Sequence, residues 1–140
     1  MSKTTDGGTT WNYLSLPSPL VTYQINNIDF VDANTGWAVG TAGPFNPALV
    51  SKTTDGGTTW NTQTLQTSPN GSAITVKMIN ANVGFVLANS LYSTIDGGTT
   101  WTKNTDPYVT STGWSGMYIM SKDIIYLNGA GTSNLKKIIR

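Results

Sequence analysis

Acidic side chains are the first candidates for chemistry in this sequence, because it contains neither His nor Cys. Without those residues, nucleophile–histidine triads and the usual zinc sites cannot form. Two carboxylates could still hydrolyse a glycosidic bond, and four of the Asp residues lie outside the repeated DGG segments: Asp29, Asp32, Asp106 and Asp123. Asp32 and Asp123 lie in or beside predicted hairpin turns, where Asp is ordinarily a turn former. We therefore expect a protein that is not an enzyme.

The remaining Asp residues belong to a repeated segment. SKTTDGGTTWN occurs identically at Ser2–Asn12 and Ser51–Asn61, and a looser copy, STIDGGTTWTK, spans Ser93–Lys103. Gly-Gly permits the positive φ of a tight turn, and Asp can accept hydrogen bonds from the turn's own amides. Ca²⁺ takes about six to eight oxygens, whereas each segment offers one carboxylate, so we expect turns that need no metal or cofactor. The residues to which we assign this structural role are Asp6, Gly7, Gly8, Thr10, Trp11, Asp55, Gly56, Gly57, Thr59, Trp60, Asp96, Gly97, Gly98, Thr100 and Trp101.

A second pattern recurs in phase with these segments. IDFVDANTGWAVG starts at Ile28, VKMINANVGFVLA at Val76 and MYIMSKDIIYLNG at Met117, at offsets of 48 and 41 residues. Each copy reads as two short strands joined by a turn, and the DGG segment adds a turn between two more strands. A period of this length, with no helical periodicity, is typical of a four-stranded propeller blade.

The fold class expected is therefore all-β, with three blades of four antiparallel strands. We expect blade 1 at 17–66, blade 2 at 67–105 and blade 3, without its outer strand, at 106–140. Three blades are too few to close a ring. We expect residues 1–16 to complete the third blade of a neighbouring copy, so that cyclic homo-oligomerisation closes the ring. A homodimer with six blades is favoured, and a homotrimer with nine remains open.

The repeated segment resembles the Asp-box, or BNR repeat, of sialidases, sortilin-type receptors and the photosystem II assembly factor family, and GWAVG, Gly36–Gly40, is similar to the last of these. The resemblance implies that each Asp caps the turn between the two outer strands of a blade, with the Trp packed beneath it. Sialidase chemistry would need an arginine cluster and a Tyr–Glu pair, which a chain with one Arg and no Glu cannot supply. The assembly-factor relatives act by binding protein partners, although their basic face is not matched here.

Two functions from different classes stay open. The first is a self-assembling structural and interaction scaffold, and the identity of the two 11-residue segments favours an engineered origin over recent duplication. The alternative is a lectin-like propeller that binds a glycan on Trp114, in the Gly- and Ser-rich stretch TSTGWSG, with Tyr108 close by. The other interpretation, which we favour, is that Trp114 fills space between blades. A protein ligand is also open.

Charge and hydropathy exclude other partners. The formal net charge is +1, with charged residues at 11%, whereas nucleic acids and anionic membranes require clustered Lys and Arg. No apolar run approaches the roughly 20 residues of a membrane span, and no signal-peptide pattern opens the chain. We expect neither a nucleic acid nor a membrane partner, and the sequence does not identify a compartment.

Overall fold

The computed structural model describes residues 1–14, 23–43, 47–65, 71–107, 109, 113–129 and 136–139. Within these ranges the chain is built from antiparallel strands and contains no helix, so the all-β prediction is confirmed. No helix in these ranges is long and apolar enough to cross a membrane.

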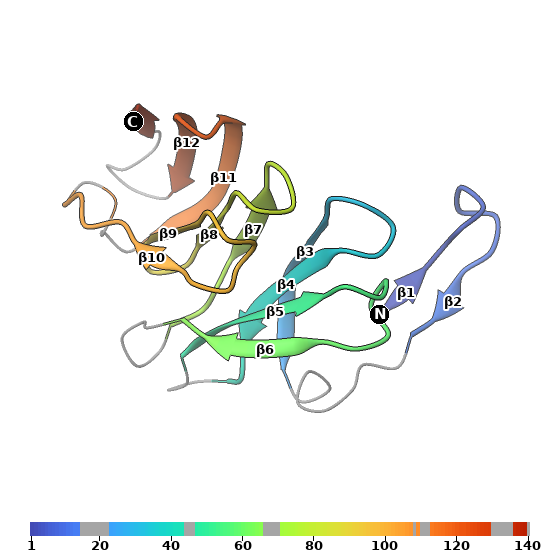
Figure 1. Cartoon of the computed structure of the whole chain (residues 1–140). Helices are drawn as coiled ribbons and strands as arrows, with labels where there is room; N and C mark the ends of the chain where they lie inside the picture. Colours follow the sequence, from blue (N-terminus) through green and yellow to red (C-terminus); the bar gives the residue numbers. More distant parts are fainter. Residues whose placement is uncertain are drawn as a thin grey trace.

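The strands form three larger sheets and one small hairpin (Figure 1). The N-terminal hairpin pairs β1 (Ser2–Lys3) with β2 (Asn12–Tyr13). Sheet 1 has the order β3 (Gln24–Phe30), β4 (Gly36–Thr41), β5 (Ala48–Thr53), β6 (Asn61–Thr64). Sheet 2 has the order β7 (Thr75–Met78), β8 (Gly84–Leu87), β9 (Leu91–Thr94), β10 (Thr102–Lys103). Sheet 3 has the order β11 (Trp114–Ser121), β12 (Ile124–Gly129), β13 (Lys136–Ile139).

The turns between the first two strands of sheets 1 and 2 are fixed by one side chain each. Asp32 Oδ1 accepts hydrogen bonds from the Asn34 and Thr35 amides, both at 2.7 Å. Asn80 Oδ1 accepts from the amides of Asn82 and Val83, both at 2.9 Å. These are turns in which a short polar side chain hydrogen-bonds the backbone two residues on, so Asp32 is held as a turn former.

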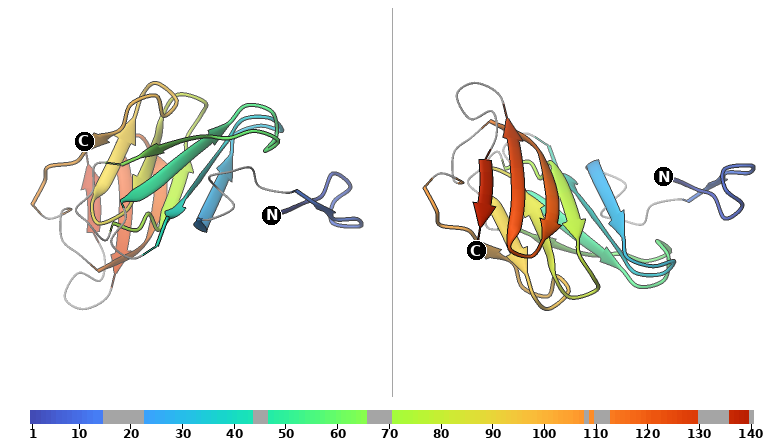
Figure 2. Two further views of the ribbon diagram at one scale, coloured as in Figure 1. Left: turned by 90° about the horizontal axis from the view of Figure 1, so that it is seen from below. Right: turned by 90° about the horizontal axis from the view of Figure 1, so that it is seen from above.

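Sheets 1, 2 and 3 follow one another with their faces toward each other (Figure 2). Side chains from neighbouring sheets form the core between these faces. The packing of strand β8 explains why its sequence is a short apolar run. Val86 packs in the cluster shared with sheet 1, which includes Trp37 and Val50, and Phe85 and Leu87 face the cluster shared with sheet 3. A strand with both faces buried has no need of polar alternation.

Polar contacts also join sheets 1 and 2. Asn27 Oδ1 on β3 accepts from the Val76 amide at 3.2 Å, and Asp29 Oδ2 accepts from the Met78 amide at 2.7 Å. Asp29 also forms an ion pair with Lys77 at 2.8 Å. Asp29 therefore joins two neighbouring sheets, although the sequence left it unassigned.

The N-terminal hairpin is a separate two-stranded sheet at the end of the molecule away from sheet 3 (Figure 2). Its strands pair with each other and not with sheet 3, whose described order is β11-β12-β13. The division at 17–66, 67–105 and 106–140 stays a prediction.

Candidate functional site: a polar cleft beside the second Asp-box

The three Asp-boxes share one hydrogen-bond arrangement. In the second box, Asp55 Oδ1 accepts from the Thr59 amide and the Thr53 hydroxyl, both at 2.8 Å, and Oδ2 accepts from the Thr59 hydroxyl at 2.5 Å. The Thr53 hydroxyl oxygen also accepts from the Gly57 amide at 2.9 Å. The boxes of Asp6 and Asp96 repeat these bonds to within 0.1 Å.

These bonds lower the carboxylate pKa values. Hydrogen bonds from the hydroxyls of Thr10, Thr59 and Thr100, the largest cause in each box, lower the pKa of Asp6, Asp55 and Asp96 to about 2. Because each carboxylate is engaged by its own turn, it is poorly placed to act as a general acid or a metal ligand. Among the described residues, no three acidic, His or Cys side chains lie together.

The backbone conformation of the box turns explains why each box contains two consecutive glycines. In all three boxes both glycines have positive φ, for example 71° at Gly56 and 94° at Gly57. Side chains other than Gly adopt this region rarely. A Cβ on Gly97 would also lie 2.7 Å from the Ala81 carbonyl oxygen, in the hairpin turn of the same sheet. The box turn therefore packs against the first turn of its own sheet.

The three tryptophans differ in their surroundings. Trp60 is 9% exposed and meets Phe30 edge-on, with ring centroids 6.2 Å apart. Trp101 is partly buried and packs against the cluster between sheets 1 and 2. Trp11, which we expected to be packed, is 63% exposed. In the described part of the chain β1 and β2 form a two-stranded sheet, which lacks the inner strands that lie beneath Trp60 in sheet 1.

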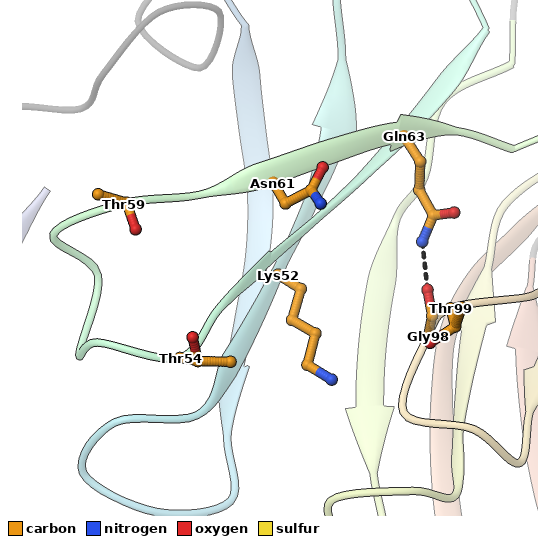
Figure 3. A pocket seen from close by; sticks show the side chains of 7 residues that line it. All are labelled: Lys52, Thr54, Thr59, Asn61, Gln63, Gly98 and Thr99. Carbon is orange, nitrogen blue, oxygen red and sulfur yellow. Dashed lines mark hydrogen bonds between the residues drawn. The ribbon is translucent and has the colours of Figure 1, made fainter.

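The candidate site is a polar cleft of about 390 Å³ between sheet 1 and the third Asp-box turn (Figure 3). Its volume lies in the range of small-ligand sites. The lining residues are Lys52, Thr54, Thr59, Asn61, Gln63, Gly98 and Thr99. Five of these come from sheet 1 and its box, and the last two come from the turn of sheet 2.

Strand pairing places the charged and amide side chains of the cleft together. Lys52 on β5 is directly opposite Asn61 on β6 and Trp37 on β4, and Val50 is opposite Gln63. Directly opposed residues share a face of the sheet. That face buries Trp37 and Val50 against sheet 2, and its outer part presents Lys52, Asn61 and Gln63 to the cleft.

The ammonium group of Lys52 lies over the aromatic ring of Trp37. Its Nζ lies 5.1 Å from the centroid of the Trp37 ring, a cation–π distance. The Trp37 ring is itself fixed, because its Nε1 donates to the Gly97 carbonyl at 3.2 Å. Among the described residues, Lys52 has no carboxylate within salt-bridge distance, whereas Lys77 and Lys122 each pair with an Asp.

Gln63 closes the inner end of the cleft. Its Nε2 donates to the Gly98 carbonyl, which joins β6 to the box turn of sheet 2 (Figure 3). In the other two boxes the equivalent carbonyl accepts from the box tryptophan, as from Trp60 Nε1 to Gly57 at 3.0 Å. Trp101 Nε1 is buried, and no described residue accepts a hydrogen bond from it. The cleft thus lies beside an indole N–H that its own turn does not satisfy.

Sequence reasoning missed Lys52, Asn61 and Gln63. Lys52 belongs to the repeated segment, which the sequence pattern explains as a turn without any role for the Lys. A lone Lys between Ser51 and Thr53, in a strand that is otherwise buried, was the available signal. Gln63 and Gly98 are 35 residues apart in the sequence, and no local sequence pattern predicts their contact.

The residue proposed as a glycan platform is not available for that role. Trp114 is 4% exposed, packs in the cluster between sheets 2 and 3, and donates from Nε1 to the Val109 carbonyl at 3.2 Å. Because its ring faces are covered, it fills space between sheets and offers no surface to a sugar. Tyr108 lies outside the described residues.

A second, more apolar hollow of about 290 Å³ lies between the N-terminal hairpin and sheet 1. Its lining includes Met1, Ile28 and Phe30, and Lys3 at its edge donates from Nζ to the Gly56 carbonyl at 3.4 Å. Lys3 occupies in the first copy of the repeated segment the position that Lys52 occupies in the second.

Sheets joined face to face, with an Asp-box turn in each of two sheets and in the hairpin, define a β-propeller of the BNR-repeat class. The family model for the Photosynthesis system II assembly factor YCF48 matches residues 1–128. The chain belongs to this family, as the sequence resemblance predicted. Among proteins with curated functions, none matches the chain.

Two solved structures share the fold. YCF48 from Cyanidioschyzon merolae superposes with a TM-score of 0.72 at 18% identity, covering 99% of this chain and 44% of that one. A structure described as YCF48 bound to D1 peptide has a TM-score of 0.63 at 24% identity, covering 83% of this chain and 41% of that one. The chain therefore spans less than half the length of either structure.

The predicted partner, a second or third copy of the chain, is wrong. The similar solved structure is described as bound to a D1 peptide. The strands that were expected to cross to a neighbour pair within the N-terminal hairpin instead. An edge strand can be satisfied by its own hairpin partner, and the sequence pattern did not distinguish this from exchange.

Proposed function

We propose that this chain is a non-catalytic interaction segment of an Asp-box propeller and that it binds an extended peptide. The observation that carries the proposal is the cleft between sheet 1 and the third box turn, which is rich in hydrogen-bonding side chains. The described residues that line it include no carboxylate, His or Cys. Such a cleft can recognise backbone amides and polar side chains without transforming them.

Family membership supports the choice of ligand. A solved structure with the same fold is described as bound to a D1 peptide, and we propose a peptide of that kind for this chain. Fold alone does not transfer function, so the proposal depends on whether the cleft accepts the peptide.

We further propose that sheets 1, 2 and 3 are three successive blades, bounded at 17–66, 67–105 and 106–140, of which the third lacks its outer strand. In this arrangement the N-terminal hairpin takes the place of the outer strands of a preceding blade. A repeated contact supports this arrangement. Lys3 Nζ lies 3.0 Å from where a Cβ of Gly56 would be, and Lys52 Nζ lies 3.0 Å from where a Cβ of Gly97 would be. An engineered origin for the duplicated segment stays a prediction.

The test is binding of a fluorescently labelled D1 peptide to the intact chain, measured by fluorescence anisotropy. We expect saturable binding that a scrambled peptide of the same composition does not reproduce, and mass spectrometry should show the bound peptide uncleaved. The proposed function would be overturned if the scrambled peptide bound as tightly as the D1 peptide. It would also be overturned if the D1 peptide did not bind at a millimolar concentration of the chain.

A further inference from the structure

We infer that the cleft at Lys52 is a carboxylate-binding subsite, which anchors a peptide through a side-chain or C-terminal carboxylate. The inference rests on the proposed peptide-binding function and names the chemical group that the cleft selects. Three features carry it: an ammonium group without an acidic partner, a fixed aromatic ring beneath it, and hydrogen-bonding groups around it in the open cleft.

The first feature is the state of the Lys52 ammonium. Within the described part of the chain it forms no ion pair, and its stem is partly buried at the edge of the sheet interface. Lys77 and Lys122 show the other arrangement, each with its Nζ at 2.7–2.8 Å from an Asp oxygen. An ammonium group can make three hydrogen bonds, so Lys52 keeps donors for a ligand.

The second feature is that Lys52 is positioned before any ligand arrives. Trp37 is fully buried, and its indole N–H is bonded across the sheet interface to Gly97. The ring attracts the ammonium group and limits where it can lie. Less conformational entropy is then lost on binding than for a freely mobile surface lysine.

The third feature is the polar surround. Asn61 lies directly across the strand pair from Lys52, and the Thr54, Thr59 and Thr99 side chains line the same space (Figure 3). The Thr59 and Thr99 hydroxyls already donate to the Asp55 carboxylate and the Asp96 carbonyl. The Asn61 amide and the Thr54 hydroxyl can donate to a carboxylate oxygen that the ammonium also holds, and charge-assisted bonds of this kind are the strong ones.

The Asp-box carboxylates of sheets 1 and 2 are held within their own turns. The box carboxylates of the two sheets that form the cleft, Asp55 and Asp96, accept hydrogen bonds from their own turns. Neither side chain is among the residues that line the cleft.

Lys3 provides a matched control. It lies in the same 11-residue segment, but its Nζ donates to the Gly56 carbonyl and it borders the more apolar hollow beside the hairpin. Lys3→Gln and Lys52→Gln remove the same charge from identical local sequences. A difference between the two variants therefore reports the cleft and not the net charge.

The experiment follows ¹H–¹⁵N spectra of the intact chain during titration with three capped tripeptides. Acetyl-Gly-Gly-Gly carries a C-terminal carboxylate, acetyl-Gly-Asp-Gly-amide a side-chain carboxylate, and acetyl-Gly-Asn-Gly-amide neither. We expect saturable shifts of the Gly98 and Thr99 amides and of the Asn61 side-chain amide with one or both acidic peptides. The acidic peptide that binds more tightly identifies the source of the carboxylate. The neutral peptide should bind at least about tenfold more weakly.

The variants complete the test. Lys52→Gln should weaken acidic-peptide binding at least about tenfold, whereas Lys3→Gln should leave it unchanged. Lys52→Arg, which keeps the charge, should retain binding. Equal affinity for the acidic and neutral peptides, equal loss in both Gln variants, or the absence of saturable shifts would overturn the carboxylate subsite. The comparison of peptides on the unmodified chain holds even if Lys52→Gln fails to fold.

Failure of this inference is distinguishable from failure of the proposed function. A D1 peptide that binds the unmodified chain and Lys52→Gln equally would overturn the carboxylate subsite and leave peptide binding standing. If acidic tripeptides bind at Lys52 but the D1 peptide does not bind the chain, the proposed function is overturned and the carboxylate subsite stands.

Discussion

The Asp-box carboxylates show how one short side chain can fix a turn. Asp96 Oδ1 and Oδ2 together accept three hydrogen bonds within their own box, at 2.6–2.9 Å. These bonds favour the charged form, and for that reason they lower the carboxylate pKa to about 2. The same group is consequently a poor general acid near neutral pH and a good structural element.

The lowered pKa values predict an acid-sensitive stability. A carboxylate whose pKa falls on folding contributes stability above its unfolded value and loses it as the pH drops through its folded value. For Asp6, Asp55 and Asp96 this window runs from 3.8 down to about 2. We expect the urea midpoint to fall across that window. Urea unfolding between pH 5 and pH 2, followed by Trp fluorescence, measures the change.

Asn substitutions assign this acid sensitivity to the boxes. The double variant Asp55→Asn, Asp96→Asn should be less stable at pH 7 and should lose less stability on acidification, because the amides do not titrate. Asp6→Asn makes the same change in the separate N-terminal hairpin and should alter the main transition less. An unchanged acid slope in the double variant would contradict the prediction.

At the scale of elements, the duplicated segment has two different environments. In sheet 1 the box stands over β3 and β4, so Trp60 packs against Ala38 and Phe30. In the N-terminal hairpin the same residues form two strands only, and Trp11 lies largely in solvent. Local sequence therefore determines the turn, and the neighbouring strands determine burial.

The two tryptophans give a matched stability test. Trp60→Ala should lower the free energy of unfolding by about 3–5 kcal/mol, the usual cost of removing a buried Trp. Trp11→Ala should change it by less than about 0.5 kcal/mol, as at other exposed positions. Both side chains donate Nε1–H to a glycine carbonyl of their own box, so that bond cancels in the comparison. Chemical denaturation measures both values, and equal losses would place Trp11 in the core.

These elements also show how much could be read from the sequence. The repeat, the all-β class, the positive φ of the box glycines and the role of Asp32 in a turn depend on neighbours within a few residues. The candidate site depends on pairs far apart, such as Gln63 with Gly98, and on the packing of Lys52 over Trp37. Only the assembled sheets reveal such contacts.

At the scale of the whole molecule, equivalent positions in the repeat differ because the sheets have different numbers of neighbours. Ile28 in sheet 1 is 43% exposed, whereas Val76, at the same repeat position in sheet 2, is 1% exposed. Sheet 2 has a neighbour on each face, and in sheet 3 Tyr118 and Met120 are exposed. The periodic pattern identifies the positions that can be buried, and adjacency decides which of them are.

This arrangement predicts a gradient of local stability. All four residues of β8 are buried, and opening that strand would disrupt the clusters on both faces of sheet 2. Its amides should exchange with solvent only through global unfolding, with the full denaturant dependence of that transition. The Asn12 and Tyr13 amides, in an exposed two-residue strand, should exchange through local opening and show little denaturant dependence. Native-state hydrogen exchange at several urea concentrations distinguishes the two behaviours. Protection of β2 equal to that of β8 would mean that the hairpin unfolds together with the sheets, and the prediction would be wrong.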